Sequence, residues 1–193
     1  RTQLDKDFSQ FKLSEALKAT YSLIWNDFCS WYIEWVKPGF EQQIDQTTYA
    51  KTIDMFEQLL QLAHPFMPFV TEEIYHTLRE QSIDLINVQL PKDNTLDMEC
   101  IGAGAHLQQV ISAVRDARNK NNVKPKDKVT LHIDTANTAL YEQVQDMICA
   151  QVNSKSMAFT NQLVAGAIAI VVGTDKIYVE TEQEVDADAQ KAK

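Results

Sequence analysis

Residues 62–75 read LAHPFMPFVTEEIY, and this stretch predicts a stiff corner between two helices. Pro65 and Pro68 cannot donate to a helical hydrogen-bond ladder, so we expect the helix that enters the corner to end there. Thr71 has the residue type of an N-cap and is expected to start the helix that leaves the corner. Helices joined by short corners favour a bundle, so the first part of the chain is predicted to be a helical bundle.

Two longer helices are expected before the corner. One begins near Leu13 and ends before Pro38-Gly39, because proline has no N–H to donate and glycine frees the backbone to turn. The other covers residues 46–64, with Asp45 or Thr47 as its N-cap. Apolar spacings of three and four predict a buried face on each helix. The inward residues are expected to be Leu17, Tyr21, Ile24, Phe28, Trp31 and Trp35 on the first helix and Tyr49, Ile53, Phe56, Leu60 and Ala63 on the second.

The second half of the chain has a different pattern. Residues 91–104 contain a polar KDNT run and two glycines, and they read as a linker. The apolar pattern then predicts, in order, a helix (105–121), a strand (129–134), a helix (136–150), a strand (157–159) and a hairpin (168–172 with 177–179). The fold class is therefore mainly α. A helical bundle in residues 1–90, its first helix cut short, precedes a small α+β domain in residues 105–185 and a charged tail, 186–193, that could begin another helix.

Composition narrows the class of protein. A chain of 193 residues with 45% hydrophobic and 23% charged residues is typical of a globular protein. It contains neither an apolar run long enough to cross a bilayer nor a signal-peptide pattern. Cys29, Cys100 and Cys149 stand far apart, which argues against a disulfide framework and favours a reducing, cytoplasmic compartment.

Charge is distributed unevenly along the chain. The net charge of −9 argues against a non-specific nucleic-acid binder. Residues 105–130 nevertheless form a basic strip, with Arg115, Arg118, Lys120, Lys124, Lys126 and Lys128 against Asp116 and Asp127. Charges are screened beyond about 8–10 Å in physiological salt. The strip could therefore contact phosphates on an otherwise acidic chain, or it could be a solvated helix end and turn.

Residues that carry chemistry are scarce. His64 and His76 stand on different elements without the companions that a metal site needs. Glu72 and Glu73 are adjacent, so they point in different directions on a helix. No glycine-rich phosphate loop is present. We therefore expect no catalytic residue and no metal ligand in this chain.

Three stretches carry a family resemblance. Residues 62–75 resemble the LHPFMPFxTEExW signature of the anticodon-binding bundle in class I aminoacyl-tRNA synthetases of the isoleucine, leucine and valine group, with Ala63 and Tyr75 as mild departures. Residues 25–38 are similar to the valyl branch of this group, and residues 111–125 resemble the helix that follows its bundle. The resemblance gives these signature residues a structural role: Trp25, Asp27, Phe28, Cys29, Trp31, Tyr32, Glu34, Lys37, Pro38, His64, Pro65, Phe66, Met67, Pro68, Thr71, Glu72 and Glu73.

The resemblance implies a fragment of a larger enzyme that attaches valine to its tRNA. The family's ATP-binding signatures do not occur here, so ATP and Mg are expected in a catalytic domain outside this chain. The chain itself, which opens at Arg1, is expected to be inactive alone and to need no cofactor. Its implied partner is a valine-specific tRNA, with no DNA and no membrane, and it is expected to be a monomer. An isoleucyl-type fragment, or a protein-interaction bundle without an RNA role, remains the alternative.

Candidate tRNA contacts follow from the chemistry of RNA recognition. Unstacked loop bases are read by stacking on aromatic or arginine planes. At the start of the bundle, Lys6, Phe8, Phe11, Lys12 and Lys18 are candidates for this role. The basic strip from Arg115 to Lys128 is expected to hold backbone phosphates, which position the RNA without specifying its sequence.

Overall fold

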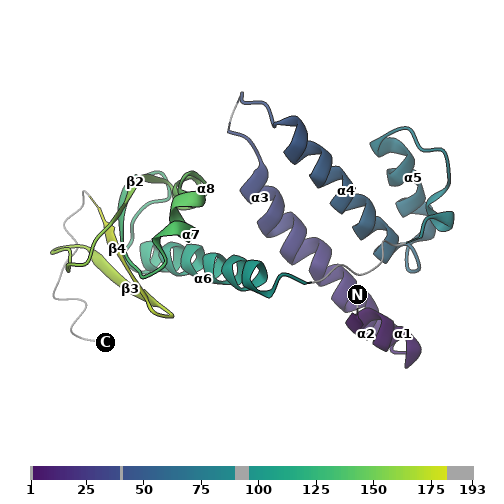
Figure 1. Ribbon diagram of the computed structural model, residues 1–193, viewed down its shortest axis with the longest axis horizontal. Helices are drawn as coiled ribbons and strands as arrows, with labels where there is room; N and C mark the ends of the chain where they lie inside the picture. The colour runs from purple at the N-terminus through teal and green to yellow at the C-terminus, as the bar shows by residue number, and fades with distance from the viewer. Residues whose placement is uncertain (1, 40, 90–95, 182–193) are drawn as a thin grey trace. The chain divides into compact units, whose positions relative to one another are not determined.

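The computed structural model describes residues 2–39, 41–89 and 96–181. The chain forms two compact units, residues 1–95 and residues 96–193 (Figure 1). Among the described residues, no helix is both long and apolar enough to cross a membrane. The charged tail at residues 186–193 and the first part of the predicted linker, residues 91–95, lie outside the described residues.

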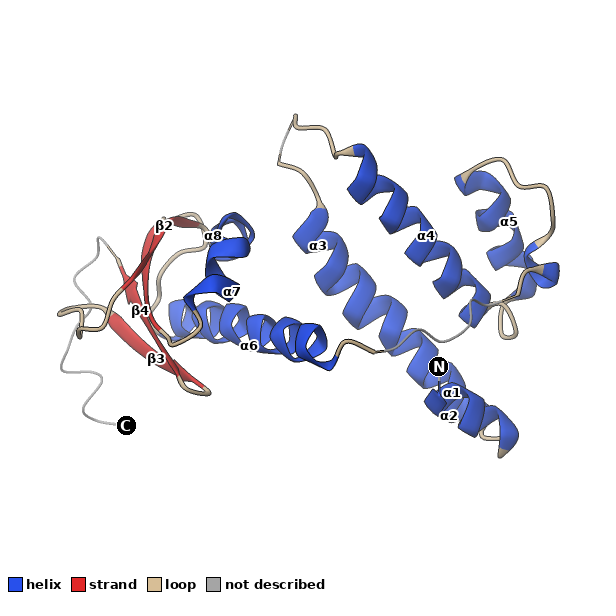
Figure 2. Cartoon of the chain, in the orientation of Figure 1, coloured by secondary structure: helices blue, strands red, loops and turns tan. Residues whose placement is uncertain are grey.

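The first unit consists of helices, as predicted (Figure 2). In chain order they are α1 (Thr2–Ser9), α2 (Leu13–Ser22), the π-helical η1 (Leu23–Tyr32), α3 (Ile33–Val36), α4 (Gln46–Ala63), α5 (Pro68–Leu78) and the 3₁₀ turn η2 (Leu85–Asn87). The backbone stays helical at Ser22, Leu23, Tyr32 and Ile33, so α2, η1 and α3 run on as one helix. Lys37 is extended, which confirms the predicted stop before Pro38.

The core of the first unit lies between the long helix, α4 and α5. Phe28 stacks on Phe56 with a centroid distance of 5.5 Å and an interplanar angle of 5°. Leu60, Tyr75 and Leu85 form a buried cluster, and Phe56 packs against it. Because α4 and α5 contribute to the same core, the proline corner does bring two bundle helices together.

The predicted buried face of the long helix is wrong at its first half. Leu17 and Tyr21 are exposed, and the small side chains of Ala16 and Thr20 are buried in their place. A helix that presents small residues can approach its neighbours closely. The π-helical segment η1 has more residues per turn than an α-helix, so the buried face does not keep the same spacing along the whole helix. Tyr49 of α4, also predicted inward, is exposed.

The helix caps agree with the prediction at one end of α4 and not at the start of α5. Asp45 caps α4 by accepting the backbone N–H of Thr48. Thr71 does not cap α5, because Pro68 already occupies the first helical position, where its fixed φ suits the helix. The Thr71 hydroxyl instead donates within the helix to the carbonyl oxygen of Met67 at 2.8 Å.

The second unit packs helices on a four-stranded sheet. Its elements are α6 (Met98–Lys120), β1 (Val129–Asp134), α7 (Thr138–Gln143), α8 (Gln145–Val152), β2 (Ser154–Phe159), β3 (Ile168–Val172) and β4 (Asp175–Glu180). The strand order is β2-β1-β4-β3, with β1 and β2 parallel and the other pairs antiparallel. In β1, buried Val129, Leu131 and Ile133 alternate with half-buried residues, so one face of the sheet carries the core.

Two helices of the second unit differ from the sequence prediction. Helix α6 begins at Met98 and not near Ala105, because Asp97 caps it by accepting the N–H of Cys100. The helix predicted over residues 136–150 is two helices, separated at Val144. The predicted hairpin is confirmed, and Gly173 supplies the left-handed φ of 59° that its two-residue turn needs.

Candidate nucleic-acid interface

A tight turn links α1 to α2 and presents Phe11 to solvent. The N–H groups of Phe11 and Lys12 donate to the carbonyl oxygens of Phe8 (3.0 Å) and Asp7 (2.8 Å). Phe11 has a φ of 55°, in the left-handed region that bulky residues rarely adopt. Its side chain is 87% exposed, so tertiary packing does not compensate for this conformation. Backbone strain at an exposed aromatic residue marks a candidate contact site.

The other predicted contacts in the bundle are of two kinds. Lys6, Lys12 and Lys18 are exposed. Phe8 is half-buried, and its ring stacks on Phe66 of the corner with a centroid distance of 5.7 Å. Phe8 therefore anchors α1 to the corner, and the accessible members of the predicted set are Phe11 and the three lysines.

An exposed apolar stripe continues from Phe11 along the long helix. Leu13, Leu17, Tyr21 and Trp25 follow one another at intervals of four, and each is exposed. The rings of Tyr21 and Trp25 are stacked, 6.2 Å apart and 9° from parallel. Sequence reasoning missed this surface, which we call the aromatic face and define as Phe11, Leu13, Leu17, Tyr21 and Trp25. The interval of four is visible in the sequence, but the apolar spacing predicts that Leu17 and Tyr21 lie in the core.

Some of the family-signature residues make contacts within the bundle, and others are exposed. His64 Nδ1 lies 2.8 Å from the Thr71 hydroxyl. The carboxylate of Glu72 accepts the backbone N–H of Leu85 at 2.6 Å, which ties η2 to α5. The exposed signature residues are Trp25, Asp27, Cys29, Lys37, Pro38, Pro65, Met67, Pro68 and Glu73.

The basic strip of the second unit divides into two groups. Lys120 at the end of α6 and Lys124, Lys126 and Lys128 in the following loop are exposed. We call these four residues the lysine group. Arg118 is 5% exposed, and its pKa is lowered because burial disfavours the charged guanidinium.

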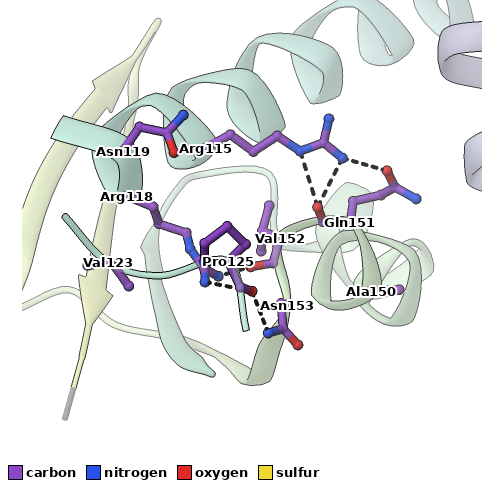
Figure 3. A pocket seen from close by; sticks show the side chains of 9 residues that line it. All are labelled: Arg115, Arg118, Asn119, Val123, Pro125, Ala150, Gln151, Val152 and Asn153. Carbon is purple, nitrogen blue, oxygen red and sulfur yellow. Dashed lines mark hydrogen bonds between the residues drawn. The ribbon is translucent and has the colours of Figure 1, made fainter. Parts of the chain in front are cut away.

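Both arginines face the carboxyl end of α8 (Figure 3). Arg118 donates to the carbonyl oxygen of Val152, and Arg115 donates to that of Gln151 at 3.0 and 3.2 Å. The last carbonyl groups of a helix have no partner in the helix and carry partial negative charge, so cations stabilise them. The arginines therefore brace α8 against α6, and the lysine group is the part of the strip that is open to a phosphate.

A shallow hollow of about 290 Å³ lies between these elements. Its lining residues are Arg115, Arg118, Asn119, Val123, Pro125, Ala150, Gln151, Val152 and Asn153 (Figure 3). Asn153 has a left-handed φ of 53° and donates from its side chain to the carbonyl oxygen of Pro125 at 2.9 Å. Many of the polar side chains that line the hollow form hydrogen bonds with one another. The hollow is therefore the place where α6, the loop after it and the end of α8 are joined.

A buried polar cluster closes the other end of the second unit. The carboxylate of Asp175 accepts hydrogen bonds from Tyr141 (2.5 Å), Thr135 (2.8 Å) and His106 (2.8 Å). Burial would raise the pKa of Asp175, but these three hydrogen bonds hold it below its ordinary value. Burial also raises the pKa of Tyr141. The cluster joins α6, α7 and the hairpin through one carboxylate.

One group of possible metal ligands lies within the described part of the chain. Glu72, His76 and Asp84 each offer a ligand atom, and these atoms lie within 4.8 Å of one another. Sequence reasoning considered His76 without these neighbours. The Glu72–His76 spacing of four was visible in the sequence, whereas Asp84 reaches the same place only through the loop after α5.

Comparison with known proteins identifies the class. Residues 2–135 match the family described as the anticodon-binding domain of tRNA ligase. The chain therefore belongs to the family of tRNA ligase anticodon-binding domains, and the match runs through the whole first unit into α6 and β1.

Relatives that match nearly the whole chain are valine–tRNA ligases. The chain is 34% identical to that of Parabacteroides distasonis over 193 residues, which are 99% of the chain and 22% of the relative. It is 38% identical to that of Porphyromonas gingivalis over 176 residues (90% and 20%). It is 33% identical to that of Lactiplantibacillus plantarum over an alignment of 201 residues, gaps included, which covers 99% of the chain and 23% of the relative. The chain thus spans about a fifth of the length of the curated relatives it matches.

Proposed function

We propose that this chain binds the anticodon arm of a valine-accepting tRNA as part of a longer valine–tRNA ligase. The observation that carries the proposal is the match of residues 2–135 to the anticodon-binding family, with valine–tRNA ligases as the relatives. The longer protein would join valine to tRNA with ATP and Mg bound by residues outside this chain. We also propose that the protein is a cytoplasmic monomer.

The aromatic face is the proposed base-contacting surface. Loop bases that are splayed out stack on aromatic side chains, at about 1–3 kcal/mol per base. Phe11 projects from a strained turn, and Tyr21 and Trp25 already form a stacked pair to which a further ring could be added. Lys12 and Lys18 are exposed on the same segment and would neutralise nearby phosphates.

The lysine group is the proposed phosphate contact. Four lysines within nine residues give a local positive potential on a chain whose net charge is −9. Phosphate contacts release counterions, so the affinity falls as salt rises. Such contacts position the RNA without reading its sequence.

The direct test is binding of fluorescently labelled valine tRNA, measured by anisotropy over a series of salt concentrations. Replacing Lys124, Lys126 and Lys128 together by alanine should weaken binding and reduce the log–log salt slope by about 2. Lys37→Ala and Lys176→Ala are matched controls, because each lysine is exposed and already paired with a carboxylate, Glu34 or Asp134. An unchanged slope in the triple variant would show that the lysine group is not the contact.

Two further measurements separate the alternatives. Isoleucine tRNA should bind more weakly than valine tRNA, and equal affinity would favour an isoleucyl-type or non-specific fragment. If neither tRNA binds at low salt, the exposed aromatic face would instead favour a protein-interaction bundle. The chain alone should show background ATP–pyrophosphate exchange with valine, and turnover above background would contradict its proposed role.

A further inference from the structure

The loop after α5 brings three ligand-type side chains to one point. His76 Nε2 lies 3.2 Å from Glu72 Oε1 and 3.2 Å from Asp84 Oδ1. Glu72 and His76 are one turn apart on α5, and Asp84 immediately precedes η2. The side chains of Glu72, His76 and Asp84 are 27%, 40% and 67% exposed, so an ion could enter from solvent without rearrangement of the fold.

Hydrogen bonding alone explains this arrangement poorly. An imidazole Nε2 carries at most one hydrogen, so it cannot donate well to both carboxylates. Both distances of 3.2 Å are at the upper limit of the range of about 2.7–3.2 Å for an N–H···O hydrogen bond. His76 Nε2 therefore lies at the same long distance from Glu72 Oε1 and Asp84 Oδ1, and it can donate to only one of them.

A tetrahedral cation is compatible with these two distances. Zinc binds histidine nitrogen and carboxylate oxygen at about 2.0–2.2 Å, so two ligand atoms at tetrahedral corners stand about 3.3–3.6 Å apart. The observed 3.2 Å on each side of His76 Nε2 is close to this separation. A divalent ion would also neutralise the two carboxylates, which repel each other without it.

One of the ligands is already positioned by the backbone. Glu72 Oε1 accepts the N–H of Leu85 at 2.6 Å, and Leu85 is in the buried cluster of the first unit. Outer hydrogen bonds of this kind orient metal ligands and raise affinity. The side chain of Tyr75 packs edge-on beside the His76 ring, with a centroid distance of 5.5 Å.

We infer that Glu72, His76 and Asp84 form a three-ligand site for a divalent transition-metal ion of the zinc class. One imidazole and two carboxylates suit zinc, cobalt or manganese better than a soft ion such as copper(I). Water completes the coordination. The ion joins the loop before η2 to α5, so it stabilises the first unit and plays no part in contacts of the aromatic face or the lysine group.

The test is zinc binding by the full 193-residue chain, freed of metal with a chelator. Calorimetric titration should give one ion at this site, and zinc should raise the unfolding temperature that is followed by tryptophan fluorescence. His76→Ala should weaken zinc binding by about tenfold or more and remove most of the thermal shift. His132→Ala is the matched control: His132 is a partly exposed histidine that lies 3.0 Å from Glu180, and its loss should change neither result.

A second variant and a cobalt spectrum test the same site independently. Asp84→Asn removes a ligand charge at the most exposed position, so it should reproduce the loss of binding even if His76→Ala folds poorly. Cobalt gives a visible spectrum in which thiolate ligands add a strong charge-transfer band, and this band should be absent, because Cys29, Cys100 and Cys149 take no part. Zinc affinity that is unchanged in both variants, no binding by the unaltered chain, or a thiolate band would each overturn the assignment.

Discussion

Arg118 donates to the carbonyl oxygen of Asp127 at 2.7 Å, and this bond joins the end of α6 to the far end of the loop that carries three lysines. The same guanidinium reaches the carbonyl oxygens of Lys124 (2.8 Å) and Pro125 (3.2 Å). A planar group with five N–H donors can hold several carbonyl groups at once. The buried arginine therefore shapes the loop from within while the lysines point to solvent. A loop that is already ordered loses less entropy when it binds a phosphate backbone.

Replacing Arg118 by alanine should lower the free energy of unfolding of the second unit by about 2–3 kcal/mol, because buried carbonyl groups lose a charged donor. All three tryptophans lie in residues 25–35, so tryptophan fluorescence reports the first unit. Circular dichroism reports both units, and the part of its transition that belongs to the second unit should shift to lower urea concentration. The fluorescence transition, which reports the first unit, should not shift. Arg115→Ala, at an exposed position on the same helix, should have a much smaller effect. Equal effects of the two variants would contradict a special role for Arg118.

The Asp175 cluster predicts a pH dependence for the second unit. The folded pKa of Asp175 is lowered, so its charged form contributes stability that is fully present above the unfolded value of about 3.9 and is lost as pH falls through the folded pKa. Urea unfolding followed by circular dichroism should show this loss beginning below about pH 5 and continuing as pH falls through the lowered pKa of Asp175. In Asp175→Asn the decline should be shallower and the unit less stable at pH 7. Asp134→Asn, which removes a longer and more exposed ion pair, should leave the pH profile unchanged.

The hydroxyl of Thr71 in the proline corner should contribute to the free energy of unfolding of the first unit. Its Oγ1 donates to the carbonyl oxygen of Met67 and meets His64 Nδ1 at 2.8 Å, and the residue is buried. Thr71→Val keeps the shape and the backbone bond to Met67 but leaves His64 Nδ1 without its hydroxyl partner, so the first unit should lose about 1–2 kcal/mol. Thr77→Val is the control, because the Thr77 hydroxyl makes the same kind of bond, to Glu73, at an exposed site. Tryptophan-monitored urea unfolding should separate the two variants, and equal midpoints would show that the corner does not depend on this hydroxyl.

Much of the fold could be predicted because the signals were local. The prolines of the corner, the Asp45 cap and the alternation in residues 129–134 each act through neighbouring residues. The buried face of the long helix could not be read in this way. Apolar spacing places the bulky residues Leu17 and Tyr21 in the core, but Ala16 and Thr20 occupy it, since close packing of helices favours small side chains. That error concealed the aromatic face.

The sequence predicts which basic residues belong to the candidate site, but it does not predict which of them are exposed to solvent. The sequence places six basic residues between Arg115 and Lys128, yet Arg118 is buried and Arg115 braces α8. The partners that decide this, Gln151 and Val152, are more than thirty residues away along the chain. The position of Asp84 beside His76 likewise depends on the path of a loop that carries no periodic pattern. Contacts that are distant in sequence leave no local signal.

Substitutions of Phe11 should affect the stability of the first unit and its affinity for tRNA differently. Glycine accepts a left-handed φ without strain, so Phe11→Gly should remove about 1 kcal/mol of backbone strain, partly offset by the larger entropy of glycine in the unfolded chain. The first unit should therefore be at least as stable in urea, followed by tryptophan fluorescence. Phe11→Ala keeps the strain and provides the comparison. If the exposed ring stacks on an RNA base, both variants should bind valine tRNA more weakly by about 1–3 kcal/mol, or roughly 5- to 150-fold in affinity. Unchanged tRNA affinity in both variants would remove Phe11 from the interface, whereas a loss in alanine alone would mean that the turn and not the ring is recognised.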